Sequence, residues 1–238
     1  MDLVYSYTAF FVAYLIGSIS FAVLVSKAMG LGDPRTYGSR NPGATNVLRS
    51  GNKVAAGLTL LLDFLKGFAP TALVQYYSFD LGFEDTTIAF VGVAAFFGHL
   101  FPVFFKFKGG KGVATAAGVL LAYEPWLGVG TLLVWVAVAA VFRFASLASI
   151  AAAVAAPFIT LVFFDQRPSL ALGVIVMSLS LIWRHWRNIL KLMSGKESRI
   201  GEKAEVDQPR KRRRRVRRLH EEVAPGHGAN QQNRNRGN

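Results

Sequence analysis

The stretch WLGVGTLLVWVAVAAVFRFASLASIAAAVAAPFITLVFF, residues 126–164, decides the fold class. It holds two long apolar runs, and the charged residue between them is Arg143. Each run is close to the roughly 20 residues that a helix needs to cross a bilayer. Neither run alternates polar and apolar residues, as the strands of a membrane barrel do, and backbone groups in hydrocarbon must be paired internally. The stretch therefore predicts two consecutive membrane-spanning helices.

The same pattern recurs along the 238-residue chain, of which 52% is apolar and only 17% charged. Soluble domains carry about 25% charge, so a soluble globular protein is excluded. The apolar runs are Val4–Val25, Val54–Tyr77, Thr87–Phe105, Gly112–Tyr123, Trp126–Phe142, Ala145–Phe164 and Ser169–Trp183. We predict an all-α, polytopic integral membrane protein with seven transmembrane helices.

Loop charge orients these helices. Basic side chains follow the first, third, fifth and seventh runs, whereas the loop after the second run carries Asp80, Glu84 and Asp85 and no base. Seven spans with the N-terminus outside place all of these basic clusters in the cytoplasm, as the positive-inside rule requires. Joining the short run Gly112–Tyr123 to the next gives six spans and moves Arg143 and the C-terminal bases outside. Seven spans with a cytoplasmic C-terminus are therefore preferred.

The C-terminal end differs in composition from the rest. Residues 194–238 carry +7 of the formal net charge of +13, and include RKRRRRVRR at 210–218. We predict a membrane domain over 1–197 and a basic, disordered cytoplasmic tail over 198–238 that is attracted to anionic lipid. A nucleic-acid-binding arm is the alternative for such a run. Because the tail is tethered to a membrane body, we expect membrane lipid and no nucleic acid as its partner.

Three polar segments fall on the predicted cytoplasmic side, and the first is residues 32–53. It combines turn-forming residues with side chains that can donate hydrogen bonds to an oxyanion. These candidate donors are Ser39, Asn41, Thr45, Asn46 and Arg49. A long polar loop of this kind is more often functional than not.

The second polar segment is residues 98–115. Lys108, Gly109, Gly110, Lys111 and Gly112 lie where an apolar helix begins. Backbone N–H groups and the positive end of the helix can face one anion there, so the segment predicts a phosphate site. The spacing is not that of a Walker A loop, so nucleotide hydrolysis does not follow.

The third polar segment is residues 184–197, where His185 and Asn188 lie three apart and share a helix face. An interfacial role for a lone His is the plainer interpretation, but two other polar segments on the same side favour catalysis. Asp63 and Lys66 are also three apart, within an apolar run. Mutual neutralisation, a structural role, is favoured for them over contact with substrate.

Two classes of chemistry are not expected. The chain has no Cys, which excludes thiol nucleophiles, disulfides and thiolate zinc sites. The carboxylates of the body are scattered, so we expect neither a metal site nor another cofactor. No Gly-x-Ser-x-Gly elbow is present, which favours direct acyl transfer over an acyl-enzyme if acyl transfer is the reaction.

GSRNPGATNVLR, GHLFPVFFKFKGGKGVAT and HWRNILKLMSGKE, at 38–49, 98–115 and 185–197, resemble the three signature motifs of the bacterial membrane-bound acyl-phosphate:glycerol-3-phosphate acyltransferases. The resemblance implies transfer of a fatty acyl group from acyl-phosphate to the 1-hydroxyl of glycerol 3-phosphate at the cytoplasmic face of the inner membrane. It implies catalytic roles for Ser39, His185 and Asn188, and phosphate binding by Arg49 and Lys111. Ser146 matches a position near the site.

Other positions of the resemblance concern structure and partners. Glu197 matches a motif residue that we assign to structure, and Arg40 stands where many relatives have Gly. A soluble enzyme that makes acyl-phosphate is a possible partner. A membrane transporter of organic phosphate is the alternative function, although its polar residues should lie near the bilayer midplane rather than gather on one face.

Overall fold

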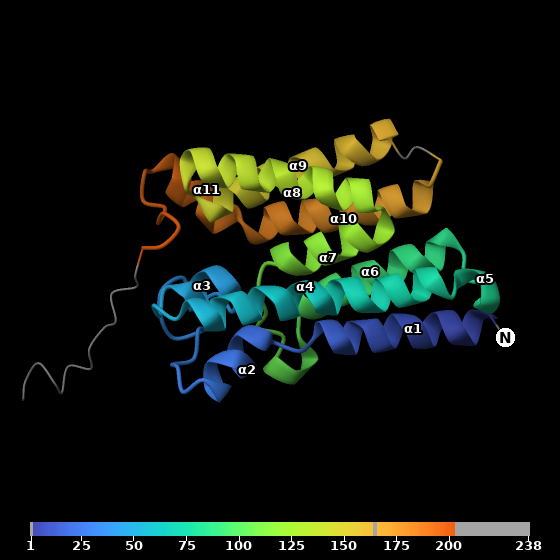
Figure 1. Ribbon diagram of the computed structural model, residues 1–238, viewed down its shortest axis with the longest axis horizontal. Coiled ribbons are helices and arrows are strands. Elements are labelled where there is room, and N and C mark those ends of the chain that lie inside the picture. The colour runs from blue at the N-terminus through green and yellow to red at the C-terminus, as the bar shows by residue number, and fades with distance from the viewer. Residues whose placement is uncertain (1, 164–165, 203–238) are drawn as a thin grey trace, which may run out of the picture. The chain divides into compact units, whose positions relative to one another are not determined.

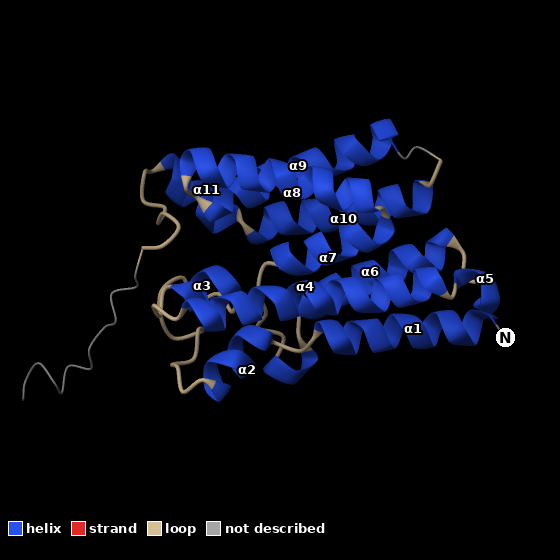
Figure 2. Ribbon diagram, viewed as in Figure 1, coloured by secondary structure: helices blue, strands red, loops and turns tan. Residues whose placement is uncertain are grey.

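Helices account for all regular secondary structure in the computed structural model, which describes residues 2–163 and 166–202 (Figure 2). The predicted all-α class is confirmed. The elements are α1 (Asp2–Gly17), α2 (Phe21–Ala28), α3 (Ala44–Leu48), α4 (Lys53–Tyr76), α5 (Ser78–Leu81), α6 (Asp85–Leu100), the 3₁₀ turn η1 (Val103–Phe105), α7 (Val113–Tyr123), α8 (Pro125–Phe142), α9 (Ala145–Phe163), α10 (Pro168–Arg184) and α11 (Trp186–Met193). Most of the predicted tail, from residue 203 onward, lies outside the described residues.

Within these ranges, four helices are long and apolar enough to cross a membrane by themselves: α4, α6 extended through η1, α8 and α9. Two bent pairs, α1 with α2 at 43° and α10 with α11 at 53°, raise the number to six if each pair is one span. α7 is apolar but has 11 residues, which rise only about 16 Å against a hydrocarbon core of about 30 Å. The count of seven, which needs α7 as a separate crossing, stays a prediction.

The first apolar run is not one continuous helix. It breaks between Gly17 and Phe21, and the ammonium of Lys66 on α4 donates a hydrogen bond of 2.7 Å to the carbonyl oxygen of Ile19 in the break. A carbonyl freed from a helix within an apolar body needs a donor. Composition alone could not reveal this bend, because the partner that stabilises it comes from another helix.

Glycines let neighbouring helices approach closely. A Cβ atom at Gly67 of α4 would collide with the carbonyl oxygen of Thr115 on α7, and one at Gly118 of α7 would collide with that of Phe64 on α4. Small residues at such contacts are typical of helices packed in a membrane. The main core lies beside this contact, where α6, α7, α8, α9 and α10 bury a cluster that includes Tyr123.

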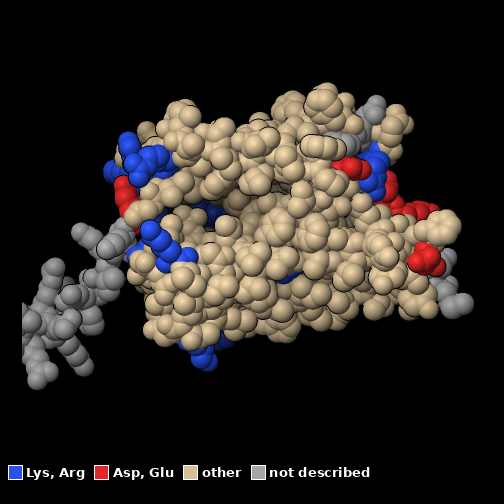
Figure 3. All heavy atoms as spheres, viewed as in Figure 1, with Lys and Arg blue, Asp and Glu red and all other residues tan. Residues whose placement is uncertain are grey.

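The outer faces of the helices are apolar, and charge gathers at their ends. Leu60 on α4, Leu133 on α8 and Phe163 on α9 are all more than half exposed. In Figure 1, α2, α3 and α11 lie at one end of the bundle, and α5 lies at the other with the start of α1. Most Lys and Arg side chains visible in Figure 3 lie at the α3 and α11 end, and most visible Asp and Glu side chains lie at the opposite end. We call the former the basic end and the latter the acidic end.

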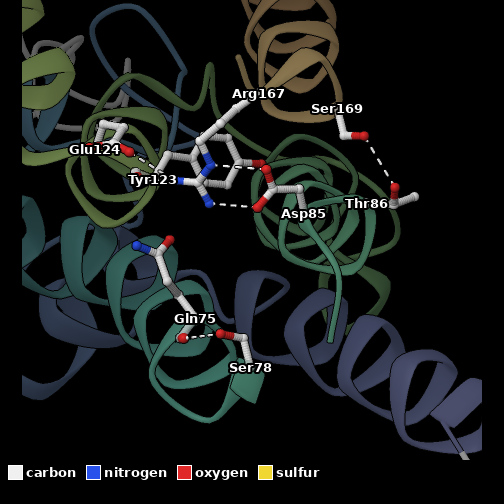
Figure 4. Close-up of polar contacts among 8 residues, drawn as sticks. All are labelled: Gln75, Ser78, Asp85, Thr86, Tyr123, Glu124, Arg167 and Ser169. Carbon is white, nitrogen blue, oxygen red and sulfur yellow. Dashed lines mark hydrogen bonds and ion pairs between the residues drawn. The ribbon is translucent and has the colours of Figure 1, made fainter. Parts of the chain in front are cut away.

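An ion-pair cluster ties helices together at the acidic end (Figure 4). Arg167, which precedes α10, makes a two-pronged contact with Asp85 of α6, with distances of 2.7 and 3.0 Å. It also donates to Glu124 at 2.7 Å, between α7 and α8. The hydroxyl of Tyr123 donates to the carbonyl oxygen of Ala89 at 2.6 Å. Arg167 is thus a link between three parts of the bundle.

Candidate active site

A cavity of about 660 Å³ extends from the basic end into the apolar bundle. Its wall includes twelve of the predicted site residues, drawn from all three polar segments and from α4 and α9: Ser39, Asn41, Thr45, Asn46, Arg49, Asp63, Lys111, Gly112, Ser146, His185, Asn188 and Glu197. Segments separated by more than 100 residues in sequence therefore meet at one site. The deeper wall is formed by α7, α8, α9 and α10 and is mostly apolar.

Asn46 organises the loop between α2 and α4. Its side-chain amide donates to the carbonyl oxygens of Pro34 at 2.6 Å and Tyr37 at 3.2 Å, and its Oδ1 accepts from the backbone N–H of Ser39 at 2.9 Å. Asn46 is 2% exposed. The sequence predicted that Asn46 binds phosphate, but its amide is already used inside the loop. Its geometry instead fixes the backbone that presents Ser39.

Two positions in this loop have left-handed backbone. Gly38 has φ +56°, and a Cβ there would collide with Asn46 Oδ1. Arg40 has φ 56° as well. Glycine adopts this conformation without the steric cost that an L side chain carries, so Gly would suit the position of Arg40.

A hydrogen-bonded chain crosses the polar end of the cavity. Lys111 Nζ donates to Asn188 Oδ1 at 2.6 Å, and Asn188 Nδ2 donates to Glu197 Oε1 at 2.8 Å. The hydroxyl of Ser146 donates to the same Glu197 oxygen at 2.7 Å. Glu197 therefore joins α9 to α11, and its assignment to structure stays a prediction. Lys111 and Asn188, predicted from different segments, are in direct contact.

Burial lowers the pKa of Lys111 to about 8. The nearby Glu197 carboxylate opposes this shift, while the neighbouring cations Lys191, Arg184 and Arg49 add to it. A cation that is costly to bury and is repelled by like charges is well suited to bind an anion, because the anion compensates for both effects.

His185 lies between α10 and α11 and is 2% exposed. Its Nδ1 is 2.9 Å from the carbonyl oxygen of Leu181. A carbonyl oxygen only accepts hydrogen bonds, so Nδ1 carries a proton, and Nε2 is the acceptor of the neutral ring. The cavity-lining imidazole is thus held in one orientation.

The glycine segment differs from its predicted role. Lys108 is exposed, and neither it nor Gly109 nor Gly110 belongs to the cavity wall. The N–H of Gly110 donates to the carbonyl oxygen of His99 at 3.1 Å, so it is not free for an anion. Gly112, with φ +83°, does line the cavity and begins α7, whose positive end faces the polar site.

The predicted pair Asp63 and Lys66 is present at the edge of the cavity. Lys66 Nζ lies 2.8 Å from Asp63 Oδ1, and both side chains are almost fully buried. His99 Nδ1 lies 3.7 Å from the same Asp63 oxygen and 3.3 Å from the hydroxyl of Thr115. Asp63 and His99 line the cavity, and Lys66 does not.

Sequence reasoning gave no role to Arg184. Its guanidinium donates to the carbonyl oxygens of Gly109 and Gly110, which belong to the second polar segment. The available signal was its position directly before His185. Among the described residues, no group of three or more His, Cys, Asp or Glu side chains is placed to hold a metal ion.

These features define a class: a helical membrane protein with a cationic site at the mouth of an apolar cavity, suited to a substrate that joins phosphate to a fatty chain. The family model described as glycerol-3-phosphate acyltransferase matches residues 7–195. The chain therefore belongs to the glycerol-3-phosphate acyltransferase family, and the sequence resemblance is confirmed. Of the two functional classes considered, the family supports the enzyme rather than the transporter.

Individual relatives agree with this assignment. A glycerol-3-phosphate acyltransferase of Paraburkholderia phytofirmans is 61% identical over 196 residues, which is 82% of this chain and 91% of the relative. One of Ralstonia nicotianae is 61% identical over 191 residues, covering 80% and 92%.

Two solved structures are also similar. Both are crystal structures of PlsY (YgiH), an integral membrane glycerol 3-phosphate acyltransferase. The glycerol 3-phosphate form has a TM-score of 0.76 and 40% identity, covering 82% of this chain and 96% of that one. The lysophosphatidic acid form has a TM-score of 0.75 and 38% identity, covering 83% and 96%.

Proposed function

We propose that this protein transfers a fatty acyl group from acyl-phosphate to the 1-hydroxyl of glycerol 3-phosphate, releasing lysophosphatidate and phosphate. The observation that carries the proposal is the cavity itself, which joins a polar mouth with Arg49 and Lys111 to an apolar interior. The names of the relatives and solved structures supply the acceptor class and the product class. The acyl-phosphate donor is what the resemblance of the three sequence motifs implies, and the cationic mouth suits its phosphate group.

With acyl-phosphate as donor and glycerol 3-phosphate as acceptor, the polar mouth of the cavity has to bring two phosphate groups together. Two dianions with phosphates about 5 Å apart repel by about 3.3 kcal/mol per charge pair at an effective dielectric of 20, or about 13 kcal/mol for four pairs. Lys111, Arg49 and the start of α7 at Gly112 supply positive charge on the cavity wall. Asn41 and Thr45 add polar groups that bind phosphate or glycerol oxygens. The predicted phosphate contact of Ser146 does not fit, because its hydroxyl donates to Glu197; its oxygen can accept from a glycerol hydroxyl.

Acyl transfer proceeds directly in this proposal. The 1-hydroxyl oxygen of glycerol 3-phosphate attacks the acyl carbonyl carbon, the bond between that carbon and the phosphate oxygen breaks, and the departing phosphate takes the hydroxyl proton. Ser39, His185 and Asn188 orient the reacting groups. His185 as general base is the alternative, since Nε2 of its neutral ring can accept a proton.

The apolar interior fits the fatty chain. From Ser146 to Ala156 the wall formed by α9 spans eleven residues, which rise about 15 Å. Each buried methylene contributes about 0.8 kcal/mol, so keeping the chain in the cavity avoids a large cost of extraction into water. Leu60 of α4 and Leu132 of α8 line the cavity and are also more than half exposed. The apolar face drawn in Figure 3 is hollowed near its middle. A chain can pass between Leu60 and Leu132 from lipid.

The basic end faces the cytoplasm of a bacterial inner membrane in this proposal, with the N-terminus outside. The separation of basic and acidic side chains between the two ends of the bundle supports this orientation. A soluble acyl-phosphate-producing enzyme on the same side would supply the donor.

Donor choice tests the proposal. The purified protein in detergent is given palmitoyl-phosphate or palmitoyl-CoA, each with glycerol 3-phosphate, and release of phosphate or CoA is measured with lysophosphatidate formation. We expect product from palmitoyl-phosphate alone. With labelled palmitoyl-phosphate, we expect no hydroxylamine-sensitive label on protein that is denatured during turnover and washed free of donor. Turnover with palmitoyl-CoA only would refute the donor, and a trapped acyl-protein would refute direct transfer.

A further inference from the structure

We propose that Arg184 is a positioning residue for Lys111: its guanidinium holds the Gly109–Gly110 backbone and thereby fixes the point from which the Lys111 side chain reaches the substrate phosphate. The inference rests on the proposed function, because it takes Lys111 as a phosphate ligand. Arg184 itself does not line the cavity.

The contacts of Arg184 with the glycine segment are specific. Nη2 donates to the carbonyl oxygens of Gly109 and Gly110, both at 2.9 Å, and Nε donates to that of Gly110 at 3.1 Å. The guanidinium carbon also lies 5.9 Å from the ring centroids of Phe101 and Trp183. A planar, always charged group that is both hydrogen-bonded and stacked has one preferred orientation.

His99 holds the same segment from the other side. Its carbonyl oxygen accepts the N–H of Gly110 at 3.1 Å, and its ring lies so close that a Cβ at Gly110 would collide with Nε2. His99 is 7% exposed and is itself held by Thr115 and Asp63. Gly110 is therefore fixed between the buried His99 ring and the Arg184 guanidinium, directly before Lys111.

This arrangement matters because glycine has more backbone freedom to lose than any other residue. Without an outside contact, two consecutive glycines would leave Lys111 poorly placed. A misplacement of about 1 Å remote from the reacting atoms can cost about a hundredfold in rate. Arg184 and Asn188 lie on the same segment, so one short stretch of chain holds both the backbone before Lys111 and the ammonium at its tip.

A simple alternative is that Arg184 acts only through its positive charge. Arg184→Lys separates the two roles, because it keeps the charge and loses both the planar fork and the stacking. If the role is positioning, Arg184→Lys and Arg184→Gln both lower kcat/KM for glycerol 3-phosphate by about 10- to 100-fold, as expected for loss of charge-assisted hydrogen bonds, with most of the loss in KM. Wild-type kcat/KM in Arg184→Lys would overturn the proposal.

Arg187 provides the matched control. It is exposed on α11, three residues from Arg184, and its guanidinium lies over Trp186. Arg187→Lys and Arg187→Gln should stay within about twofold of wild type. Losses equal to those at Arg184 would show a general effect of positive charge and overturn the proposal.

A double-mutant cycle tests whether Arg184 acts through Lys111. In a Lys111→Met background, Arg184→Lys should cause little further loss, because no ammonium remains to be positioned. Independent, multiplicative losses would contradict the proposal. If Arg184→Lys does not fold in thermal unfolding assays, Gly110→Ala disturbs the same segment from the His99 side and should raise the KM for glycerol 3-phosphate. An unchanged KM would refute the proposal.

The controls also separate this inference from the proposed function. Wild-type turnover with palmitoyl-phosphate is measured first in the same preparations. Its absence would refute the donor, whereas normal wild-type turnover with an unaffected Arg184→Lys variant would refute only the role of Arg184.

Discussion

Binding of glycerol 3-phosphate should weaken as pH rises through about 8, because Lys111 loses its charge there. Burial is the largest cause of its lowered pKa of about 8, and Glu197 only partly opposes it. A phosphate dianion binds the ammonium form and so raises the pKa of Lys111 in the complex. The affinity for glycerol 3-phosphate is therefore highest below the pKa of Lys111 in the free protein and falls as the pH rises above it.

The magnitude follows from the titration of one group. With a pKa of about 8, Lys111 is about nine-tenths charged at pH 7 and about one-tenth charged at pH 9, so the dissociation constant should rise about tenfold over this range. The phosphate of the substrate, with a second pKa of about 6, remains a dianion throughout. Titration calorimetry in two buffers of different ionisation enthalpy should also detect uptake of about half a proton at pH 8.

Lys111→Arg is the control, since a guanidinium stays charged above pH 12. Its affinity at pH 7 should be lower, because the planar group does not reproduce the contact with Asn188, but it should change little between pH 7 and 9. A wild-type affinity that is flat over this range, or a variant with the same slope as wild type, would refute the assignment of the titration to Lys111.

Three further outcomes are expected. Lys66→Met should destabilise the fold by about 3–5 kcal/mol, because Asp63 loses its ammonium partner and the carbonyl oxygen of Ile19 loses its donor. The double variant with Asp63→Asn should recover only the part due to Asp63, since the Ile19 carbonyl still lacks a donor. Thermal unfolding measures both, exposed Lys27→Met is the control, and a double variant no more stable than Lys66→Met would count against the pairing argument. Ala156→Leu, at the inner end of the cavity, should shift the donor preference toward acyl chains shorter by about two or three methylenes, with a change in donor affinity of about fourfold per methylene. The control Val154→Leu, at an exposed position, should not shift it, and an unchanged chain-length profile in Ala156→Leu would argue against an acyl chain in this cavity. EDTA should leave turnover unchanged, and inactivation reversed by Mg²⁺ would show a metal requirement.

The helices of the bundle could be predicted from sequence because length and apolarity are local properties. The run Trp126–Phe142 corresponds to α8, which begins one residue earlier at Pro125, and Gly112–Tyr123 corresponds to α7. Local patterns did not predict the break near Ile19. That break depends on a donor that reaches it from α4, 47 residues away in sequence.

In the candidate site, too, local sequence patterns predicted some features, whereas others depend on contacts between distant parts of the chain. Sequence motifs brought Lys111 and Asn188 into one prediction, and the structure places them in contact. They could not indicate that the amide of Asn46 is used inside its own loop, or that the N–H of Gly110 is bound to His99. A motif specifies which groups are present, whereas the direction in which each points depends on the folded backbone.

The cluster around Arg167 affects how this molecule can move. Because Arg167 holds the start of α10 to Asp85 and Glu124, we expect the helix ends at the acidic end to stay together while those at the basic end move more. Distances between spin labels at the two ends of α10 and α6 should vary only at the basic end; equal variation at both would contradict this. At the basic end, the contacts from Lys111 through Asn188 to Glu197 join the start of α7 to α11, so the groups proposed to bind the substrate phosphate also hold this end of the bundle together.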